Sequence, residues 1–175
     1  GMIVGYAAEA RLESMWLRGR GGITSISKSD DHDRKKKGDR EIVYKGHRFM
    51  IECKSLQTAM VKKVGPGVYT GKAQCDASDR RKIKLPDGSS VETTCLLVGE
   101  FDILAVNLFA FENKWRFVFA LNSDLPRSQF AKYTPSQRKH LLATLVNVSW
   151  PPKPPFREEP FALMDAIISK RKKKS

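Results

Sequence analysis

The chain has 175 residues, of which 41% are hydrophobic and 29% charged, a composition typical of one globular domain and unlike that of a disordered chain. Lys and Arg number 32 against 19 Asp and Glu, and the resulting net charge of +13 indicates a polyanionic partner such as nucleic acid. The most apolar run, residues 101–111, is shorter than the about 20 residues of a membrane span, so we expect no membrane partner. The three cysteines form no CxxC pair, so we expect no disulfide framework and a cytoplasmic protein.

The first half of the chain predicts a helix followed by strands. The clearest signal is Gly46-His47 between two alternating runs, 40–45 and 48–54, which predicts a β-hairpin closed by a type II′ turn. The other elements expected in this half are a helix over 6–18, a strand over 23–26 and a polar loop over 27–38.

The second half is less regular. Residues 56–100 carry turn signals and predict a β-rich excursion. The apolar run 101–111 favours a strand buried on both faces, with 115–121 as its partner. Residues 134–137 read Thr-Pro-Ser-Gln, the form of a capped helix start, and predict a helix that runs to about residue 145.

These elements predict an α/β (α+β) fold with a mixed central sheet flanked by helices. We expect a single domain over residues 2–150. Residues 151–175 then form a Pro-rich connector, a final helix and a basic tail.

The predicted hairpin gathers charged side chains on one face. Side chains alternate along a strand, so Glu52 and Lys54 share the polar face. The expected register places Glu41 opposite Glu52 and Asp39 opposite Lys54. Like charges opposite each other destabilise a sheet, so three carboxylates here need a reason. Mg²⁺, which prefers hard oxygen ligands, is the simplest one.

Asp39 followed by Glu52-Cys53-Lys54 on the next strand resembles the PD-(D/E)xK nuclease superfamily, which includes restriction endonucleases. The order helix, strand, strand, strand, with Glu9 on the opening helix, is similar to the αβββαβ core of that family. The resemblance implies a restriction endonuclease-like fold. It also implies a Mg²⁺-dependent deoxyribonuclease, an endonuclease that hydrolyses phosphodiester bonds in DNA.

The resemblance also implies a role for each matching residue. Asp39 and Glu52 would hold Mg²⁺, with Mn²⁺ as a substitute, helped by the backbone carbonyl of Cys53. Lys54 would position or activate the attacking water, and Glu9 would support the site or hold a second ion. A cut through both strands usually takes two active sites, so a homodimer is expected. The alternative metal ligands are Asp33 and Glu41.

Basic side chains outside the hairpin predict contacts to a phosphate backbone. They are Lys35, Lys36, Lys37, Arg80, Arg81, Lys172 and Lys173. Two other interpretations stay open. One is a catalytically inactive nucleic-acid-binding module on a nuclease-like fold, because Gly38 stands where the family pattern has Pro before Asp39. The other is a small basic protein that docks on RNA.

Overall fold

The computed structural model describes residues 2–28 and 39–175. Helix α1 continues directly into a π-helical turn, Glu13–Leu17, so the predicted opening helix is confirmed and begins earlier than expected. The elements in chain order are α1 (Met2–Leu12), β1 (Ile23–Lys28), β2 (Arg40–Tyr44), β3 (His47–Ser55), β4 (Lys62–Gly65), β5 (Val68–Gln74), β6 (Asp76–Lys84), β7 (Ser90–Cys95), β8 (Ile103–Asn107), β9 (Phe117–Leu121), α2 (Pro135–Arg138), β10 (Leu145–Trp150) and α3 (Phe161–Lys174).

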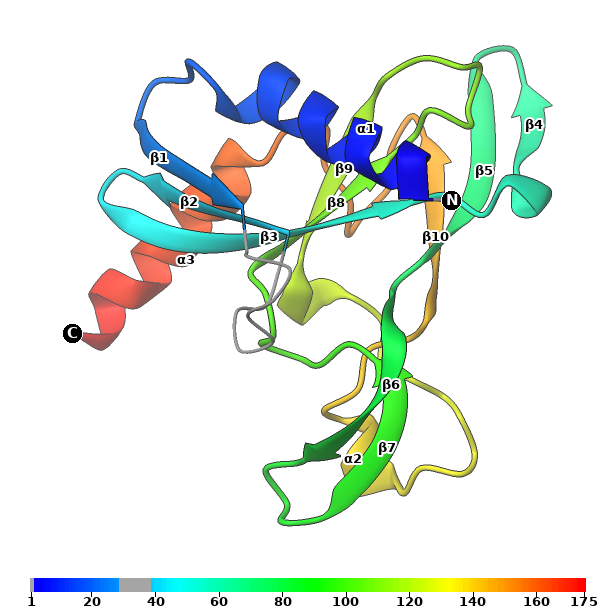
Figure 1. Ribbon diagram of the computed structural model, residues 1–175, viewed down its shortest axis with the longest axis vertical. Coiled ribbons are helices and arrows are strands. Elements are labelled where there is room, and N and C mark those ends of the chain that lie inside the picture. The colour runs from blue at the N-terminus through cyan, green and yellow to red at the C-terminus, as the bar shows by residue number, and fades with distance from the viewer. Residues whose placement is uncertain (1, 29–38) are drawn as a thin grey trace.

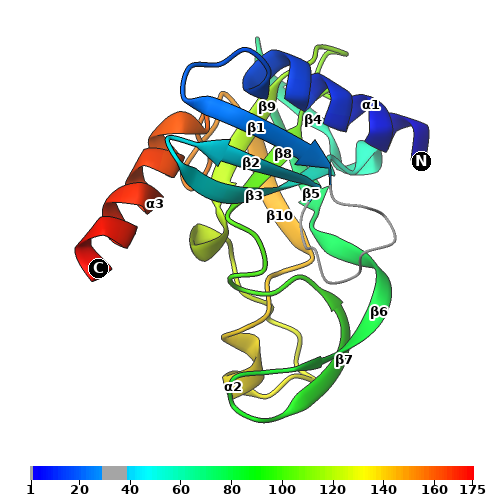
Figure 2. The same cartoon turned by 60° about the vertical axis from the view of Figure 1, so that its left-hand side comes forward.

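A five-stranded sheet with the order β1-β2-β3-β8-β9 forms the centre of the molecule (Figure 1). Strands β3 and β8 run parallel, and the other neighbours run antiparallel. The predicted α+β fold with a mixed central sheet is therefore confirmed. Helices α1 and α3 pack against one face of this sheet, and the smaller sheet β10-β5-β4 covers the other (Figure 2).

Strand β8 explains why the apolar run is nearly unbroken. Every residue of Ile103–Asn107 is buried, because the strand lies between the helical layer and the smaller sheet. The strand is shorter than the predicted 101–111, since the chain turns after Asn107, whose side-chain oxygen accepts the N–H of Phe109.

The connection from β3 to β8 differs from the family core that the sequence resembles. A parallel pair needs a long crossover, which is most often helical. Residues 56–102 are all described, and they cross through β4–β7 and a 3₁₀ turn, with no α-helix. The predicted β-rich excursion is confirmed, and it replaces the second helix of the αβββαβ order.

The β2–β3 hairpin forms, but its predicted turn is wrong. The loop residues are Lys45 and Gly46, with φ of 49° and 80°, and two positive φ values define a type I′ turn. The pairing moves by two residues from the predicted register. Because the side-chain period of a strand is two, every apolar side chain keeps its predicted face.

The helix predicted from residue 134 is wrong beyond its first turn. Its capping box is present, since Thr134 and Gln137 bond reciprocally, but α2 ends at Arg138. Residues 145–150, which begin where the predicted helix is expected to end, form β10, paired antiparallel with β5 and with Val146 and Val148 in the core. The helix stops early because Leu141 and Leu142 are buried and form bridges to Leu97 and Arg127, and these tertiary contacts outweigh the local helical start signal.

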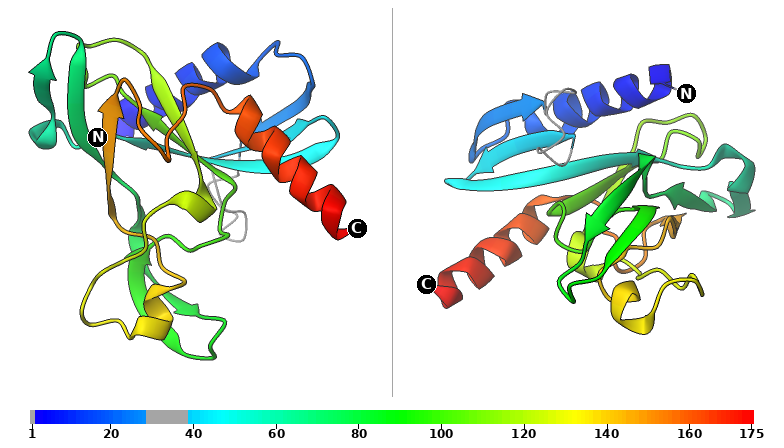
Figure 3. Two further views of the ribbon diagram at one scale, coloured as in Figure 1. Left: turned by 180° about the vertical axis from the view of Figure 1, so that it is seen from behind. Right: turned by 60° about the horizontal axis from the view of Figure 1, so that its bottom comes forward.

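The ribbon of β6 and β7, together with α2, forms a lobe below the central sheet (Figures 1 and 3). It has a small core of its own, centred on Leu85, Cys95 and Leu141. Helix α3 packs on the central sheet through Leu163, Met164 and Ile168, and so joins residues 151–175 to the main core. No helix in the described part of the chain is long and apolar enough to cross a membrane.

Candidate active site

Asp39 lies at the point where the β2–β3 ladder ends. Its N–H donates to the carbonyl of Ile51 at 2.9 Å, and its Oδ2 accepts the N–H of Cys53 at 2.7 Å. Strand β3 continues beyond β2, so the carboxylate of Asp39 takes the place of a strand partner for Cys53. The carbonyl and N–H of one strand residue point to the same side. The Cys53 carbonyl therefore faces the edge that Asp39 occupies.

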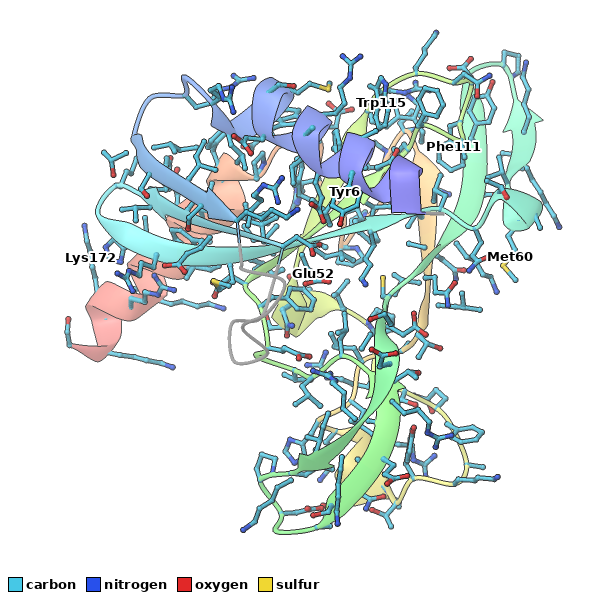
Figure 4. All side chains as sticks on the ribbon, in the orientation of Figure 1. Tyr6, Glu52, Met60, Phe111, Trp115 and Lys172 are labelled. Carbon is cyan, nitrogen blue, oxygen red and sulfur yellow. The ribbon has the colours of Figure 1, made fainter. Side chains whose placement is uncertain are left out.

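Glu52 and Lys54 lie on the same face of β3. Asp39 and Glu52 lie directly beyond the last pair of the ladder, Arg40 with Ile51, and the side chain of Glu52 is only 12% exposed. The Nζ atom of Lys54 lies 3.4 Å from Oε1 of Glu52 and donates to the carbonyl of Asp76 at 2.7 Å. Lys54 is thus held between the carboxylate and the first residue of β6. Figure 4 places Glu52 at the level where the central sheet meets the lower lobe.

Helix α1 brings Glu9 to the same place. Oε2 of Glu9 lies 3.2 Å from Nη1 of Arg40, and the same Nη1 donates to the carbonyl of Asp39 at 2.9 Å. Arg40 also reaches Glu13 at 3.2 Å, and its side chain is only 7% exposed. One buried guanidinium therefore holds Glu9 of α1 and Glu13 of the π-helical turn against the end of β2.

The pKa of each of the three carboxyl groups is raised, and burial is the largest cause in each case. Burial is the main cause for Glu52, and the charge of Asp39 adds to it, so that the pKa of Glu52 rises to about 7. Burial also raises the pKa of Asp39, against the opposing effect of the Cys53 N–H and of Lys54. The pKa of Glu9 rises through burial and the charge of Asp39. Such a cluster favours the binding of a proton or another cation.

The donor atoms fit a hard divalent cation. Among residues 2–28 and 39–175, no group of three His, Cys, Asp or Glu side chains is arranged to hold a metal ion by itself. Mg²⁺ commonly takes one or two carboxylates and completes its shell with other oxygens and water. Asp39 and Glu52 supply two carboxylates, and the main chain of Cys53 supplies a carbonyl oxygen beside them.

The structure moves Glu41 away from this site. The prediction that Glu41 lies opposite Glu52 is wrong, since Glu41 pairs with Met50 across the hairpin. Its Oε1 atom lies 3.6 Å from Nε of Arg48, whose side chain is 82% exposed. The two-residue change of register at the turn is the physical reason. Asp33, the other alternative ligand, lies outside the described residues.

The predicted nucleic-acid contacts fall in separate places. Arg80 is exposed, whereas Arg81 binds both carboxylate oxygens of Glu100 and the carbonyl of Cys95. Lys172, like Lys173, lies on the exposed last turns of α3, far from Glu52 (Figure 4). Lys35, Lys36 and Lys37 lie outside the described residues.

Sequence reasoning missed Arg40, although a signal for it exists. Arg40 stands on the same face of β2 as Ile42 and Tyr44, which belong to the core. An arginine at an apolar position needs an acidic partner. Glu9 on α1 and Glu13 at the start of the π-helical turn are the matching pair.

No protein-family model and no curated protein matches this sequence. Among solved structures, the chain is similar to that of a bacterial homing endonuclease, I-Ssp6803I, at 17% sequence identity. The alignment covers 81% of this chain and 85% of that chain, with a TM-score of 0.38. A likeness at this level assigns no role to any residue.

Proposed function

We propose that the protein is a metal-dependent nuclease of the PD-(D/E)xK type, an endonuclease that hydrolyses phosphodiester bonds in DNA in the cytoplasm. The observation that carries the proposal is the cluster of Asp39, Glu52 and Lys54 next to the main chain of Cys53. Asp39 accepts the N–H of Cys53, and Lys54 contacts Glu52. Two carboxylates that are largely shielded from solvent beside one amine lower the stability of the fold, and sites of this kind are most often functional.

Each side chain has a distinct task in this proposal. Asp39 and Glu52 hold Mg²⁺ or Mn²⁺ together with the Cys53 carbonyl. Bound metal would polarise the phosphodiester and make a water molecule a better nucleophile. Lys54 orients that water or faces the charge that develops on the phosphate, and its bond to the Asp76 carbonyl fixes its direction. Glu9 holds Arg40, whose guanidinium also donates to the carbonyl of Asp39, and so Glu9 supports the site.

The net charge of +13 supports DNA as the substrate, because DNA carries a dense row of phosphates. Binding that depends on phosphate contacts should weaken steeply as salt rises. A homodimer would supply the two active sites needed to cut both strands of a duplex.

The test is a cleavage assay on supercoiled plasmid and on single-stranded DNA, with Mg²⁺, Mn²⁺ or EDTA. We compare the natural sequence with Lys54→Ala and with Lys63→Ala, an exposed lysine on β4 that serves as the control. We expect metal-dependent nicking that falls by about 100-fold in Lys54→Ala, the usual effect of losing one transition-state contact, and is unchanged in Lys63→Ala.

DNA binding by Lys54→Ala should persist in a filter-binding assay, because Lys54 is one cation among many. Cleavage that is equal in both variants would refute the placement of the site. Binding without cleavage of either substrate in any metal would refute the enzyme and favour an inactive binding module.

A further inference from the structure

The β6–β7 ribbon leaves the body of the protein directly from the candidate site. Asp76, the first residue of β6, accepts the bond from Lys54 through its carbonyl. The pairing with β7 then shifts between Asp76 and Arg81, which inserts extra residues into β6. Bulges of this kind bend a strand and change the direction of its side chains. The ribbon consequently projects from the central sheet as the lower lobe (Figure 1).

One face of the ribbon is occupied within the protein. Ile83 and Val91 pack against the small core of the lobe, and Thr93 is buried. Arg81 is held by Glu100 and by the carbonyl of Cys95. This face supports the ribbon, and its side chains are not available to a partner.

The other face is exposed and carries a mixed set of polar side chains. Arg80, Lys82 and Lys84 alternate along β6, and all three are exposed. On β7, Glu92 lies opposite Lys82 and Ser90 lies opposite Lys84, and both are exposed. The bulge adds the exposed Asp79. The face is basic overall, but it has hydrogen-bond acceptors as well as donors.

Both the shape and the chemistry of this outer face fit the major groove of duplex DNA. The groove of B-DNA admits a two-stranded β-ribbon. Arg and Lys suit the acceptors of guanine, Glu accepts from the amino group of cytosine, and Ser bonds to either kind of edge. A surface that met phosphates alone would gain nothing from Glu92, which stands in the middle of the row. The mixture therefore favours base edges over backbone.

We propose that the outer face of the β6–β7 ribbon enters the major groove of duplex DNA and reads base edges beside the cleavage site. The inference rests on the proposed function only in taking DNA as the substrate. It adds the form of that substrate, a duplex, and the element that selects its sequence.

The first test measures binding to duplex DNA in EDTA, where no cleavage occurs. The variant Arg80→Gln/Lys82→Gln/Lys84→Gln is compared with Arg48→Gln/Lys63→Gln/Lys114→Gln. Each variant loses one Arg and two Lys, and the control side chains lie on the body of the protein, with Arg48 82% and Lys114 66% exposed. We expect the ribbon variant to bind at least about tenfold more weakly than the control variant. Equal losses in the two variants would overturn the proposal.

The second test separates base reading from phosphate contact. The natural protein, the ribbon variant and Glu92→Gln each select from a pool of duplexes with a randomised centre. We expect the natural protein to enrich a sequence motif, and both variants to lose or change part of it. A motif that all three proteins share, or no motif for the natural protein, would overturn base reading. Because neither test needs catalysis, a protein that binds in this way but never cuts would refute the proposed nuclease and leave the ribbon's role intact.

Discussion

Replacing Glu52 by glutamine should stabilise the folded protein at alkaline pH. Glutamine has the same shape and keeps an oxygen that can accept from Lys54, which lies 3.4 Å from the carboxylate. It removes a charge that is buried beside Asp39. The change therefore isolates the cost of holding that charge in the folded state.

The size of the effect follows from the pKa of Glu52, which rises from its ordinary 4.5 to about 7. Between these two values the folded protein keeps a proton that the unfolded chain has released, so the free energy of unfolding falls as the pH rises. At about 1.4 kcal/mol for each pH unit, the loss amounts to about 3 kcal/mol above pH 7. Glutamine has no such loss, and below pH 4.5 the two proteins should be equally affected by this residue.

The assay is urea unfolding in EDTA at about pH 4.5 and about pH 8.5, followed by circular dichroism. Glu52→Gln should gain about 3 kcal/mol over the natural protein at the higher pH and little at the lower. Glu41→Gln, on the same hairpin but paired with exposed Arg48, is the control and should change by less than about 1 kcal/mol at both. A gain for Glu52→Gln that is independent of pH, or no gain at about pH 8.5, would refute the electrostatic reasoning.

The same variant should lose metal-dependent cleavage, because it removes a metal ligand in the proposed mechanism. A substitution that raises stability and abolishes activity usually replaces a residue whose role is functional and not structural. A more stable variant that still cleaves at the natural rate would leave the buried charge of Glu52 without an explanation.

Three further outcomes are expected. Arg40→Met should lower the free energy of unfolding by about 3 kcal/mol, since it leaves Glu9 and Glu13 without their buried cation; an unchanged urea midpoint would contradict this. Gly71→Ala should cost about 1 kcal/mol, because a Cβ there would lie 3.2 Å from the fully buried ring of Phe111, whereas Gly5→Ala on α1, with open space around it, should stabilise by up to about 1 kcal/mol. Burial, with Asp39 nearby, raises the pKa of the Cys53 thiol, so iodoacetamide at about pH 8 should label Cys53 far more slowly in the folded than in the urea-unfolded protein, and equal rates would refute it.

The sequence alone determined the hairpin and the face on which Glu52 and Lys54 stand. Alternation with a period of two decides which side of β3 is apolar, and that pattern is local. The burial of β8 and the cap of α2 were likewise predictable from neighbouring residues, because the forces involved act over a few positions.

The register of the hairpin was decided only by the tertiary structure. A turn at Gly46-His47 and a turn at Lys45-Gly46 differ by two residues and keep the same faces, so the hydrophobic pattern cannot distinguish them. The difference nevertheless places Asp39, rather than Glu41, beside Glu52 at the end of the ladder. Which carboxylates can act as ligands thus depends on the register of the hairpin, and the local hydrophobic pattern does not determine that register.

Contacts between distant segments complete the site, and these too belong to the tertiary structure. Arg40 meets Glu9 across 31 positions of the chain, and Lys54 meets the Asp76 carbonyl across 22. The strand at 145–150 forms for the same reason, since β5 offers it a partner and a core to face. Composition and periodicity indicate the secondary structure that each segment favours. The burial of charges and the pairing of strands depend instead on which distant segments come into contact in the folded protein.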